Sequence, residues 1–329
     1  MTVSTSSGIK LIADIGGTNA RFALAIDKRV HHEVEVKCAD FPNLNDAVEF
    51  YLKQISAAER PTEAAFAIAA ALNGDQISLT NSHWKFSVQG VCNELNLKRL
   101  IVVNDFTALA MSIRHLQDNE LMQVGGLQPE ANKPMAVLGP GTGLGVSGLI
   151  PAGNSWIPLE GEGGHVSWSP NNERETAVLN WLWKEFDHVS AERVMSGMGL
   201  VNLYNALSAL NGKPPSNFEP ADVTAHALNK TDNTCVEALQ MFCSILGSVA
   251  GNLVLTLGAK GGVYIAGGIV PRLGDYFLQS PFRRSFENKG RYKQYLSSVP
   301  AYVMTAKQPA FTGLVQAFDS IGPRIEVLA

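Results

Sequence analysis

Residues 11–25, LIADIGGTNARFALA, place an acidic residue, two adjacent glycines and a threonine between two apolar segments. The continuous apolar run at 11–13 is typical of a strand covered on both faces, and 21–25 is typical of a return strand. Gly16 and Gly17 are expected to form the turn, because glycine adopts φ angles that other residues avoid. Such a turn exposes backbone N–H groups that could bind phosphate, although the same pattern also fits an ordinary hairpin.

A similar pattern occurs in the middle of the chain. Residues 139–145, GPGTGLG, lie between apolar runs at 136–138 and 146–150. A dinucleotide-binding turn should open a helix, and this one is followed by a strand pattern, so that interpretation is excluded. The sequence also has no GxxxxGK[ST] loop. The repetition of strand, glycine turn with threonine, and strand indicates an internal duplication whose two halves face across a cleft.

Polar residues that could act on a ligand follow an apolar strand pattern at 100–103. Asn104 and Asp105 come directly after it, and a helical pattern begins at Phe106. In open α/β sheets, ligands bind at the carboxyl ends of the strands. A helix N-cap is the alternative explanation for Asp105, because aspartate is favoured there whatever its function.

A second polar set lies in the middle third of the chain. The segment 159–166, LEGEGGHV, offers a carboxylate at Glu162 and an imidazole at His165, and its glycines exclude a helical HExxH metal site. An incidental polar turn is the alternative. Glu192 is predicted in the first turn of a helix capped by Ser190, where the helix dipole favours a carboxylate in any case.

The elements that must position these residues alternate between strand and helix patterns, which predicts an α/β protein. Strand patterns occur at 34–37, 64–71, 77–84, 100–103, 263–266 and 301–306. Helix patterns occur at 45–55, 88–97, 106–116, 173–186, 235–257 and 311–321. Gly267 and Gly268 form another glycine turn at a strand's carboxyl end.

Composition excludes several classes of protein. The 329 residues are 46% hydrophobic and 17% charged, which predicts a packed core rather than disorder. A net charge of −4 gives no reason to expect nucleic acid or an anionic membrane as partner. The four cysteines form no CxxC pair, the N-terminus lacks signal-peptide features, and no apolar run is judged long enough to span a membrane. We therefore expect a soluble cytoplasmic protein with reduced thiols.

Several separated motifs together resemble one family. They are LIADIGGTNARFALA, VVNDFTALA, GPGTGLGV with LEGEGGHVSW, and VSAERVMSGMGLVNLY with GGVYIAGGIVPR. In this order they resemble the bacterial glucokinases of the hexokinase and actin-like ATPase superfamily, over residues of about 10 to 320. The resemblance implies transfer of the γ-phosphoryl group of ATP to the 6-hydroxyl of D-glucose, the first step of glycolysis.

The resemblance also implies an architecture. The expected fold is a duplicated, two-domain actin-like (ribonuclease H-like) α/β fold with a cleft between its domains. The small domain is expected at 1–112 plus 305–329, and the large domain at 113–304. The family further implies a homodimer, and closure of the domains when the sugar binds.

Site residues follow from the resemblance position by position. The ATP-binding residues are expected to be Ala13, Asp14, Ile15, Gly16, Gly17, Thr18, Gly141, Thr142, Gly143, Gly267, Gly268 and Ile269. The sugar-binding residues are expected to be Asn104, Asp105, Glu162, His165 and Glu192. Asp105 is expected to be the catalytic base, and Asp14 to serve Mg²⁺ through water.

Three positions depart from the pattern of related kinases. The segment 166–170, VSWSP, has no cysteine where repressor-like relatives carry a zinc motif, so no zinc site is expected. The segment 70–74, AALNG, lacks the proline expected there, and Pro309 is not followed by the expected glycine. The last two departures affect loops beside the expected site rather than the residues assigned to chemistry.

Other functions remain open at this point. A kinase for mannose, fructose or glucosamine would carry nearly the same motifs. A non-catalytic sugar sensor would bind both ligands without turnover, but no basic helix-turn-helix segment precedes residue 11. An actin-like structural ATPase would not need the hexose-binding set of Glu162, His165 and Glu192.

Overall fold

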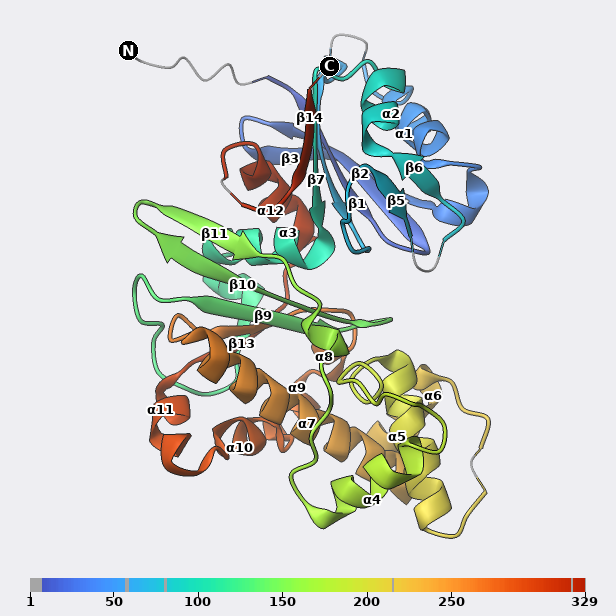
Figure 1. The fold of residues 1–329 in the computed structure, drawn as a ribbon, viewed down its shortest axis with the longest axis vertical. Coiled ribbons are helices and arrows are strands. Elements are labelled where there is room, and N and C mark those ends of the chain that lie inside the picture. The colour runs from blue at the N-terminus through green and yellow to red at the C-terminus, as the bar shows by residue number, and fades with distance from the viewer. Residues whose placement is uncertain (1–7, 57–58, 80–81, 215, 321, 329) are drawn as a thin grey trace. The chain divides into compact units, whose positions relative to one another are not determined.

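The computed structural model describes residues 8–56, 59–79, 82–214, 216–320 and 322–328. By its internal contacts the chain divides into two compact units. The first unit comprises residues 1–117, 149–160 and 306–329, and the second comprises 118–148 and 161–305. The described residues form two six-stranded sheets with flanking helices and one small two-stranded sheet (Figure 1).

The first sheet combines a hairpin with three parallel strands. Its strands, in spatial order, are β14 (Ile325–Leu328), β7 (Arg99–Asn104), β4 (Glu63–Ile68), β1 (Lys10–Ile15), β2 (Asn19–Ile26) and β3 (Arg29–Lys37). Strands β1, β4 and β7 are parallel, whereas β2, β3 and β14 pair with their neighbours in an antiparallel manner. Ile15, Ile68 and Asn104 share one register level, so the carboxyl ends of the parallel strands lie at one edge.

Helices cover both faces of this sheet (Figure 1). On one face, α1 (Leu44–Leu52) and α2 (Val88–Glu94) pack in a core that includes Leu11 and Ala13. On the other face, α3 (Asp105–Ser112) and α12 (Pro309–Ala317) pack on Ile12. Alternate residues of the apolar run therefore enter different cores, as expected for a strand buried on both faces.

The second sheet repeats this arrangement. Its strands, in spatial order, are β11 (Ser155–Leu159), β10 (Leu144–Ala152), β9 (Met135–Pro140), β12 (Val263–Ile265), β13 (Ala301–Met304) and β8 (Leu121–Gln123). Strands β9, β12 and β13 are parallel, and β8 is antiparallel to β13. In each sheet, the first parallel strand (β1 or β9) is followed on one side by the next two strands of the chain, and an antiparallel strand (β14 or β8) forms the opposite edge. The predicted duplication requires such a repetition.

The longest helix, α7 (Asn233–Leu257), is the central helix of the second unit's core. Its length and apolar composition would suffice to span a membrane, which corrects the expectation that no segment reaches that length, yet 67% of its most apolar window is buried inside the protein. Gly247 and Gly251 lie against the backbone of α10 (Phe282–Glu287). The neighbouring helices are α4 (Glu173–Leu182), α5 (Gly197–Leu210), α6 (Pro220–Leu228), α8 (Val270–Leu273), α9 (Asp275–Gln279) and α11 (Lys293–Ser298).

The predicted helix at residue 189 is wrong. Residues 189 and 191 exchange backbone hydrogen bonds with 168 and 166, and Ser190 forms a bridge with Ser167. The segment is therefore held extended by a distant part of the chain. The helix that follows, α5, begins after Ser196, whose side chain accepts a hydrogen bond from the backbone N–H of Gly199.

The predicted extended segment 77–84 is only partly a strand. Strands β5 (Gln76–Ser78) and β6 (Lys85–Ser87) form a separate two-stranded sheet. Residues 80–81 of the predicted segment lie outside the described residues.

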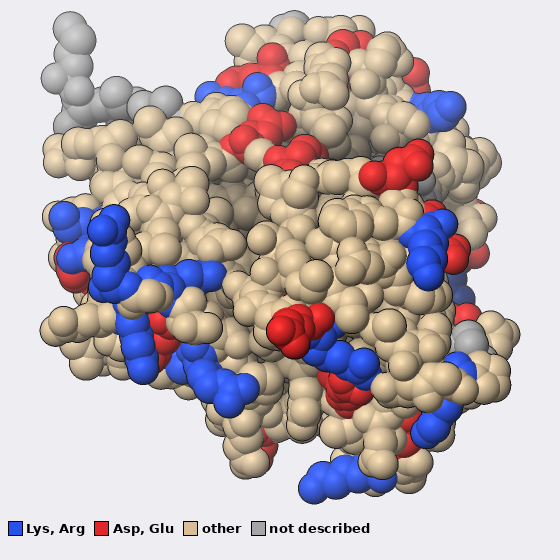
Figure 2. Space-filling view, turned by 60° about the horizontal axis from the view of Figure 1, so that its bottom comes forward, with Lys and Arg blue, Asp and Glu red and all other residues tan. Residues whose placement is uncertain are grey.

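Charged side chains of both signs occur on the face drawn in Figure 2, and most of the surface between them is uncharged. This face therefore has mixed charge, in keeping with the small net charge of the chain.

Candidate active site

The first glycine turn joins β1 to β2. The backbone N–H of Gly16 donates to the carbonyl of Asn19 at 3.0 Å, which closes the turn. Neither Gly16 nor Gly17 is among the described glycines with positive φ, so the expected reason for these glycines is wrong. A Cβ at Gly16 would lie 3.3 Å from the Asn19 carbonyl oxygen, and close packing within the turn is the reason that the structure gives.

Cys38 contacts this turn and is the first residue of the 3₁₀ helix Cys38–Asp40, which follows β3. Its N–H donates to the carbonyl of Thr18 at 2.8 Å, and its Sγ lies 3.4 Å from the carbonyl oxygen of Gly16. Burial raises the pKa of this thiol, which keeps it protonated. A cavity of about 400 Å³ opens here, lined by Gly17, Thr18, Cys38, Ala39, Ser82 and His83. A pocket therefore lies beside the exposed Thr18, as phosphate binding at the turn requires.

Asp14 belongs to a row of charges across three strands. Arg21 is its register partner on β2, and Nη1 of Arg21 donates to Asp14 Oδ2 at 3.2 Å. The same guanidinium donates from Nε to Glu35 Oε2 on β3, also at 3.2 Å. Burial raises the pKa of Asp14, and the charge and hydrogen bond of Arg21 oppose that rise.

The surroundings of Asp14 fit a magnesium ion that also binds phosphate. Mg²⁺ is usually held by one or two carboxylates together with waters and substrate phosphates. The Asp14 side chain is 25% exposed, and the hydrogen bond that it accepts from Arg21 reaches Oδ2, whereas no described side chain donates to Oδ1. Among the described residues no group of three His, Cys, Asp or Glu could hold a metal ion by itself. A single partly exposed carboxylate such as Asp14 is compatible with an ion held through water.

Asn104 and Asp105 lie at the same sheet edge as the first glycine turn. Asn104 is two strands away from Ile15, which corresponds to about 10 Å at the usual strand spacing. Asn104 is the N-cap of α3, because its Oδ1 accepts from the N–H groups of Phe106 at 2.9 Å and Thr107 at 3.4 Å. The alternative that Asp105 is the N-cap is therefore wrong, although Asp105 Oδ1 also lies 2.9 Å from the Phe106 nitrogen.

The second and third glycine segments lie side by side in the second unit. Strands β9 and β12 are parallel neighbours, so the turns at their carboxyl ends meet. A Cβ at Gly139 would lie 2.6 Å from the carbonyl carbon of Ala266, and a Cβ at Gly267 would overlap the carbonyl oxygen of Pro140. Gly267 also has φ +82°, which favours glycine. Residues 141–143 and 267–269, which were expected to bind ATP, are thus brought together.

Glu192 lies against the second glycine turn. Its Oε2 accepts a hydrogen bond from the backbone N–H of Leu144 at 2.8 Å. The backbone of the same segment is also fixed, since the N–H of Glu192 donates to the Gly164 carbonyl at 2.9 Å and that of Gly197 donates to the Gly141 carbonyl at 2.9 Å. The sequence pattern predicted Glu192 in the first turn of a helix, and the structure instead holds its carboxylate on a backbone N–H 48 residues away.

Glu162 and His165 lie near each other on the 3₁₀ turn Gly163–His165. His165 Nε2 is 3.9 Å from Glu162 Oε2, and both side chains are well exposed, at 60% and 58%. The intervening Gly164 packs so closely that a Cβ would overlap the Leu144 carbonyl oxygen. The segments that carry Glu162, His165 and Glu192 therefore pack around the second glycine turn, in the second unit. Asn104 and Asp105 belong to the first unit.

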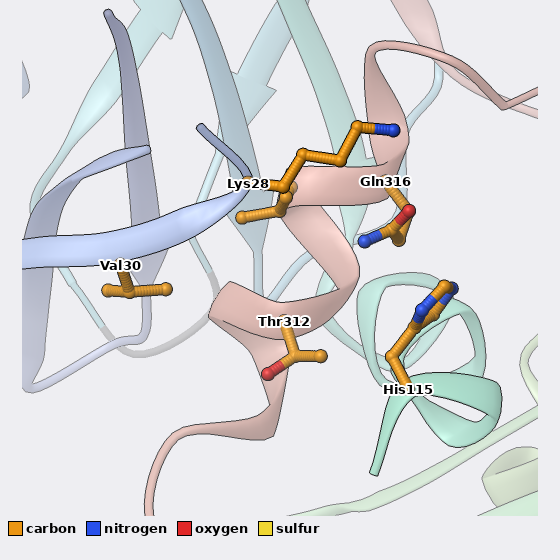
Figure 3. A pocket seen from close by; sticks show the side chains of 6 residues that line it. Lys28, Val30, His115, Thr312 and Gln316 are labelled. Atoms are coloured by element: carbon orange, nitrogen blue, oxygen red, sulfur yellow. The ribbon is translucent and has the colours of Figure 1, made fainter. Parts of the chain in front are cut away.

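Another cavity, of about 350 Å³, lies in the first unit (Figure 3). Lys28, Val30, His115, Thr312, Val315 and Gln316 line it. Lys28 follows the end of β2 that is remote from Gly16, and its Nζ is paired with Asp319 at 3.0 Å. This cavity is therefore not part of the phosphate turn.

Comparison with known proteins identifies the family of the chain. The family model described as Glucokinase matches residues 11–320. A glucokinase from Chromobacterium violaceum is 48% identical over 317 residues, which cover 96% of this chain and 91% of that protein. The crystal structure of a glucokinase from an Antarctic psychrotroph has a TM-score of 0.86 and 36% identity, covering 95% of this chain and 99% of the other. A ROK family glucokinase from Streptomyces griseus, solved with glucose and AMPPNP, shares the fold at 18% identity with a TM-score of 0.63, over 94% of this chain and 98% of that one.

These matches span both units of the chain and include both glycine turns. The fold is the two-domain actin-like α/β fold of the sugar kinases. The chain belongs to the glucokinase family.

Proposed function

We propose that this protein transfers the γ-phosphoryl group of ATP to the 6-hydroxyl of D-glucose, giving glucose 6-phosphate and ADP. The observation that carries the proposal is the glucokinase match over residues 11–320, because this range includes both glycine turns and all five candidate sugar-binding residues. The mechanism must use positioning and charge stabilisation, since phosphoryl transfer needs little covalent help from the enzyme.

Each of the two glycine turns is proposed to bind phosphate oxygens of ATP. Backbone N–H groups of residues 16–18 and 141–143 would bind phosphate oxygens, and the exposed hydroxyls of Thr18 and Thr142 would add donors. Residues 267–269, beside the second turn, would contact the adenosine. Asp14 would hold Mg²⁺ through water, and the ion would supply neutralisation of charge on the phosphate oxygens.

Asp105 is the proposed general base. As the O6 atom of glucose bonds to the γ-phosphorus, the proton of the 6-hydroxyl passes to the carboxylate, and the bond between the γ-phosphorus and its bridging oxygen breaks to release ADP. The position at the start of α3 suits this role, because α3 begins at the sheet edge that also carries the first glycine turn.

The sugar is proposed to bind through Asn104, Glu162, His165 and Glu192, together with Asp105. Carboxylates, an amide and an imidazole can pair with each hydroxyl of a hexose. A site built in this way would reject a sugar with one inverted hydroxyl, because a polar group enclosed together with the sugar would lose its partner.

A panel of hexoses tests the proposed substrate. We expect glucose to give the highest kcat/KM in an assay of ADP release, with mannose, fructose and glucosamine lower by about tenfold or more, since a lost hydrogen bond to a charged group costs about 1.5–3 kcal/mol. A higher kcat/KM for one of the other hexoses would identify a kinase for that sugar instead.

Domain closure is proposed to protect the reaction from water, which also carries a hydroxyl group. The candidate sugar-binding residues belong to two different units, so a closed state would complete the set only when sugar is present. Small-angle scattering should then show a smaller radius of gyration with glucose than without it. An unchanged radius would contradict closure.

The family also supports a cytoplasmic homodimer. Light scattering of the purified protein should give twice the chain mass of 35.4 kDa. A mass of one chain at micromolar concentration would contradict the dimer.

A further inference from the structure

We infer that Gly143 is a positioning residue for the carboxylate of Glu192, and that the phosphate turn and the sugar site are joined through this contact. The inference rests on the proposed function, because it takes Glu192 as a sugar-binding residue. Gly143 was assigned to ATP from the sequence, and the structure gives it a second role in sugar binding.

Gly143 leaves space for the Glu192 carboxylate because glycine has no side chain. A Cβ there would lie 2.5 Å from Glu192 Oε2 and 3.4 Å from its Cδ, and the first distance is well inside normal contact. Gly143 is not among the described glycines with positive φ, so its backbone conformation does not exclude alanine. The absence of a side chain is therefore needed for the approach of the carboxylate.

Hydrogen bonds hold the backbone on both sides of this contact. Glu192 is tied by its own N–H to the Gly164 carbonyl, and the turn is tied at its start by the hydrogen bond from the Gly197 N–H to the Gly141 carbonyl. A methyl group at position 143 would therefore displace the Glu192 side chain rather than either segment. The N–H of Leu144 would lose its acceptor, and the carboxylate would leave its place.

The Glu192 carboxylate has a second oxygen, Oε1, that could bind the sugar. Oε2 accepts from the Leu144 N–H at 2.8 Å, which holds this oxygen at the turn, and Oε1 could accept from sugar hydroxyls. A sugar bound to Glu192 would hold the carboxylate in place and so stabilise its hydrogen bond with the Leu144 N–H. This N–H belongs to the glycine turn that is proposed to bind phosphate. Such coupling is reciprocal and is typically 5–150-fold between two ligands.

Glucose binding without nucleotide tests the inference, measured by calorimetry on the full-length protein. Gly143→Ala should raise the glucose Kd by about tenfold or more, because a hydrogen bond to a charged group is lost. Gly141→Ala is the matched control, since a Cβ at Gly141 would meet only the Gly268 nitrogen at 4.0 Å, an ordinary contact. We expect its glucose Kd to stay within twofold of the wild type, and only its Kd for AMPPNP to change.

Two further variants separate the possible failures. If Glu192→Ala leaves the glucose Kd unchanged, the proposed sugar-binding role of Glu192 is wrong. If Glu192→Ala weakens glucose binding but Gly143→Ala affects only AMPPNP, as Gly141→Ala does, the role of Gly143 is wrong and the proposed function stands.

A double-mutant cycle with Glu192→Asp distinguishes displacement of the carboxylate from a general loss of folding. The shorter side chain withdraws from position 143, so Gly143→Ala should cost less glucose affinity in that background. Equal costs in the two backgrounds would overturn the inference. Retained glucose enhancement of AMPPNP binding in Gly143→Ala would overturn the coupling.

Discussion

Asp105→Asn is expected to lower kcat for glucose phosphorylation by about 10²–10⁴-fold, the usual contribution of a positioned general base. The amide has nearly the same shape as the carboxylate, but it cannot accept the proton of the 6-hydroxyl. Its oxygen can still accept from the Phe106 N–H, which lies 2.9 Å from Oδ1 in the wild type. The loss should therefore appear in kcat, with the glucose Kd within a few-fold of the wild type.

The folding of α3 provides the control for this variant. Asn104, and not Asp105, caps the helix through Phe106 and Thr107. Asp105→Asn removes only the favourable charge of Asp105 in the first turn, so it should cost less stability than Asn104→Ala, which should lose about 1 kcal/mol, the usual value of an N-cap. A kcat close to that of the wild type in Asp105→Asn would show that another group takes the proton.

Gly313→Val is expected to destabilise the first unit by about 3 kcal/mol, near the upper end of the usual cost of overpacking. Gly313 is buried on α12, and a Cβ there would overlap the carbonyl oxygen of Ala108 on α3. Valine adds two further methyl groups at this contact. The two helices would have to separate, which would expose core residues such as Phe311 and Leu314. Denaturant unfolding should show the loss as a lower midpoint.

Thr312→Val is the matched control, because it introduces the same side chain at the preceding position of the same helix. Thr312 lines the cavity in Figure 3 rather than the contact with α3, and its change should stay within about 0.5 kcal/mol. Equal midpoints for the two variants would contradict the account of the α3–α12 contact.

The central strands of both sheets were predictable because they carry continuous apolar runs. Strand β4 and strand β7 are buried on both faces, so their side chains need no alternation of polar and apolar residues. The edge strands β8, β11 and β14 were not predicted. They are only three to five residues long and half exposed, so neither their hydrophobicity nor their periodicity distinguishes them from loops.

The candidate site could be predicted from the sequence as a set of residues, but not as a set of contacts. Glycine turns and polar residues after apolar strands mark Asp14, Asp105 and Gly143 by type and position. Nothing in local spacing indicates that Glu192 accepts from Leu144, since that hydrogen bond depends on tertiary packing. The same packing overrode the local helix signal at Ser190, because residues 189 and 191 pair with the segment 166–168.

The glycine-turn motif alone also could not predict the pairing of Asp14 with Arg21. It requires the register of β1 against β2, in which these two residues are opposite each other. Ser82 and His83 beside the first turn were missed for a similar reason, since they reach the cavity from a separate segment of the first unit. No local sequence signal marks either of them.

The most direct test of the central claim is ADP formation by the purified protein with ATP and Mg²⁺, measured with and without glucose. The account predicts that ADP and glucose 6-phosphate form in equal amounts, and that ADP formation falls at least 100-fold when the sugar is omitted. ADP formation at the same rate without sugar would indicate a structural ATPase. Binding of glucose and ATP without any turnover would indicate a sugar sensor, and either result would contradict the account.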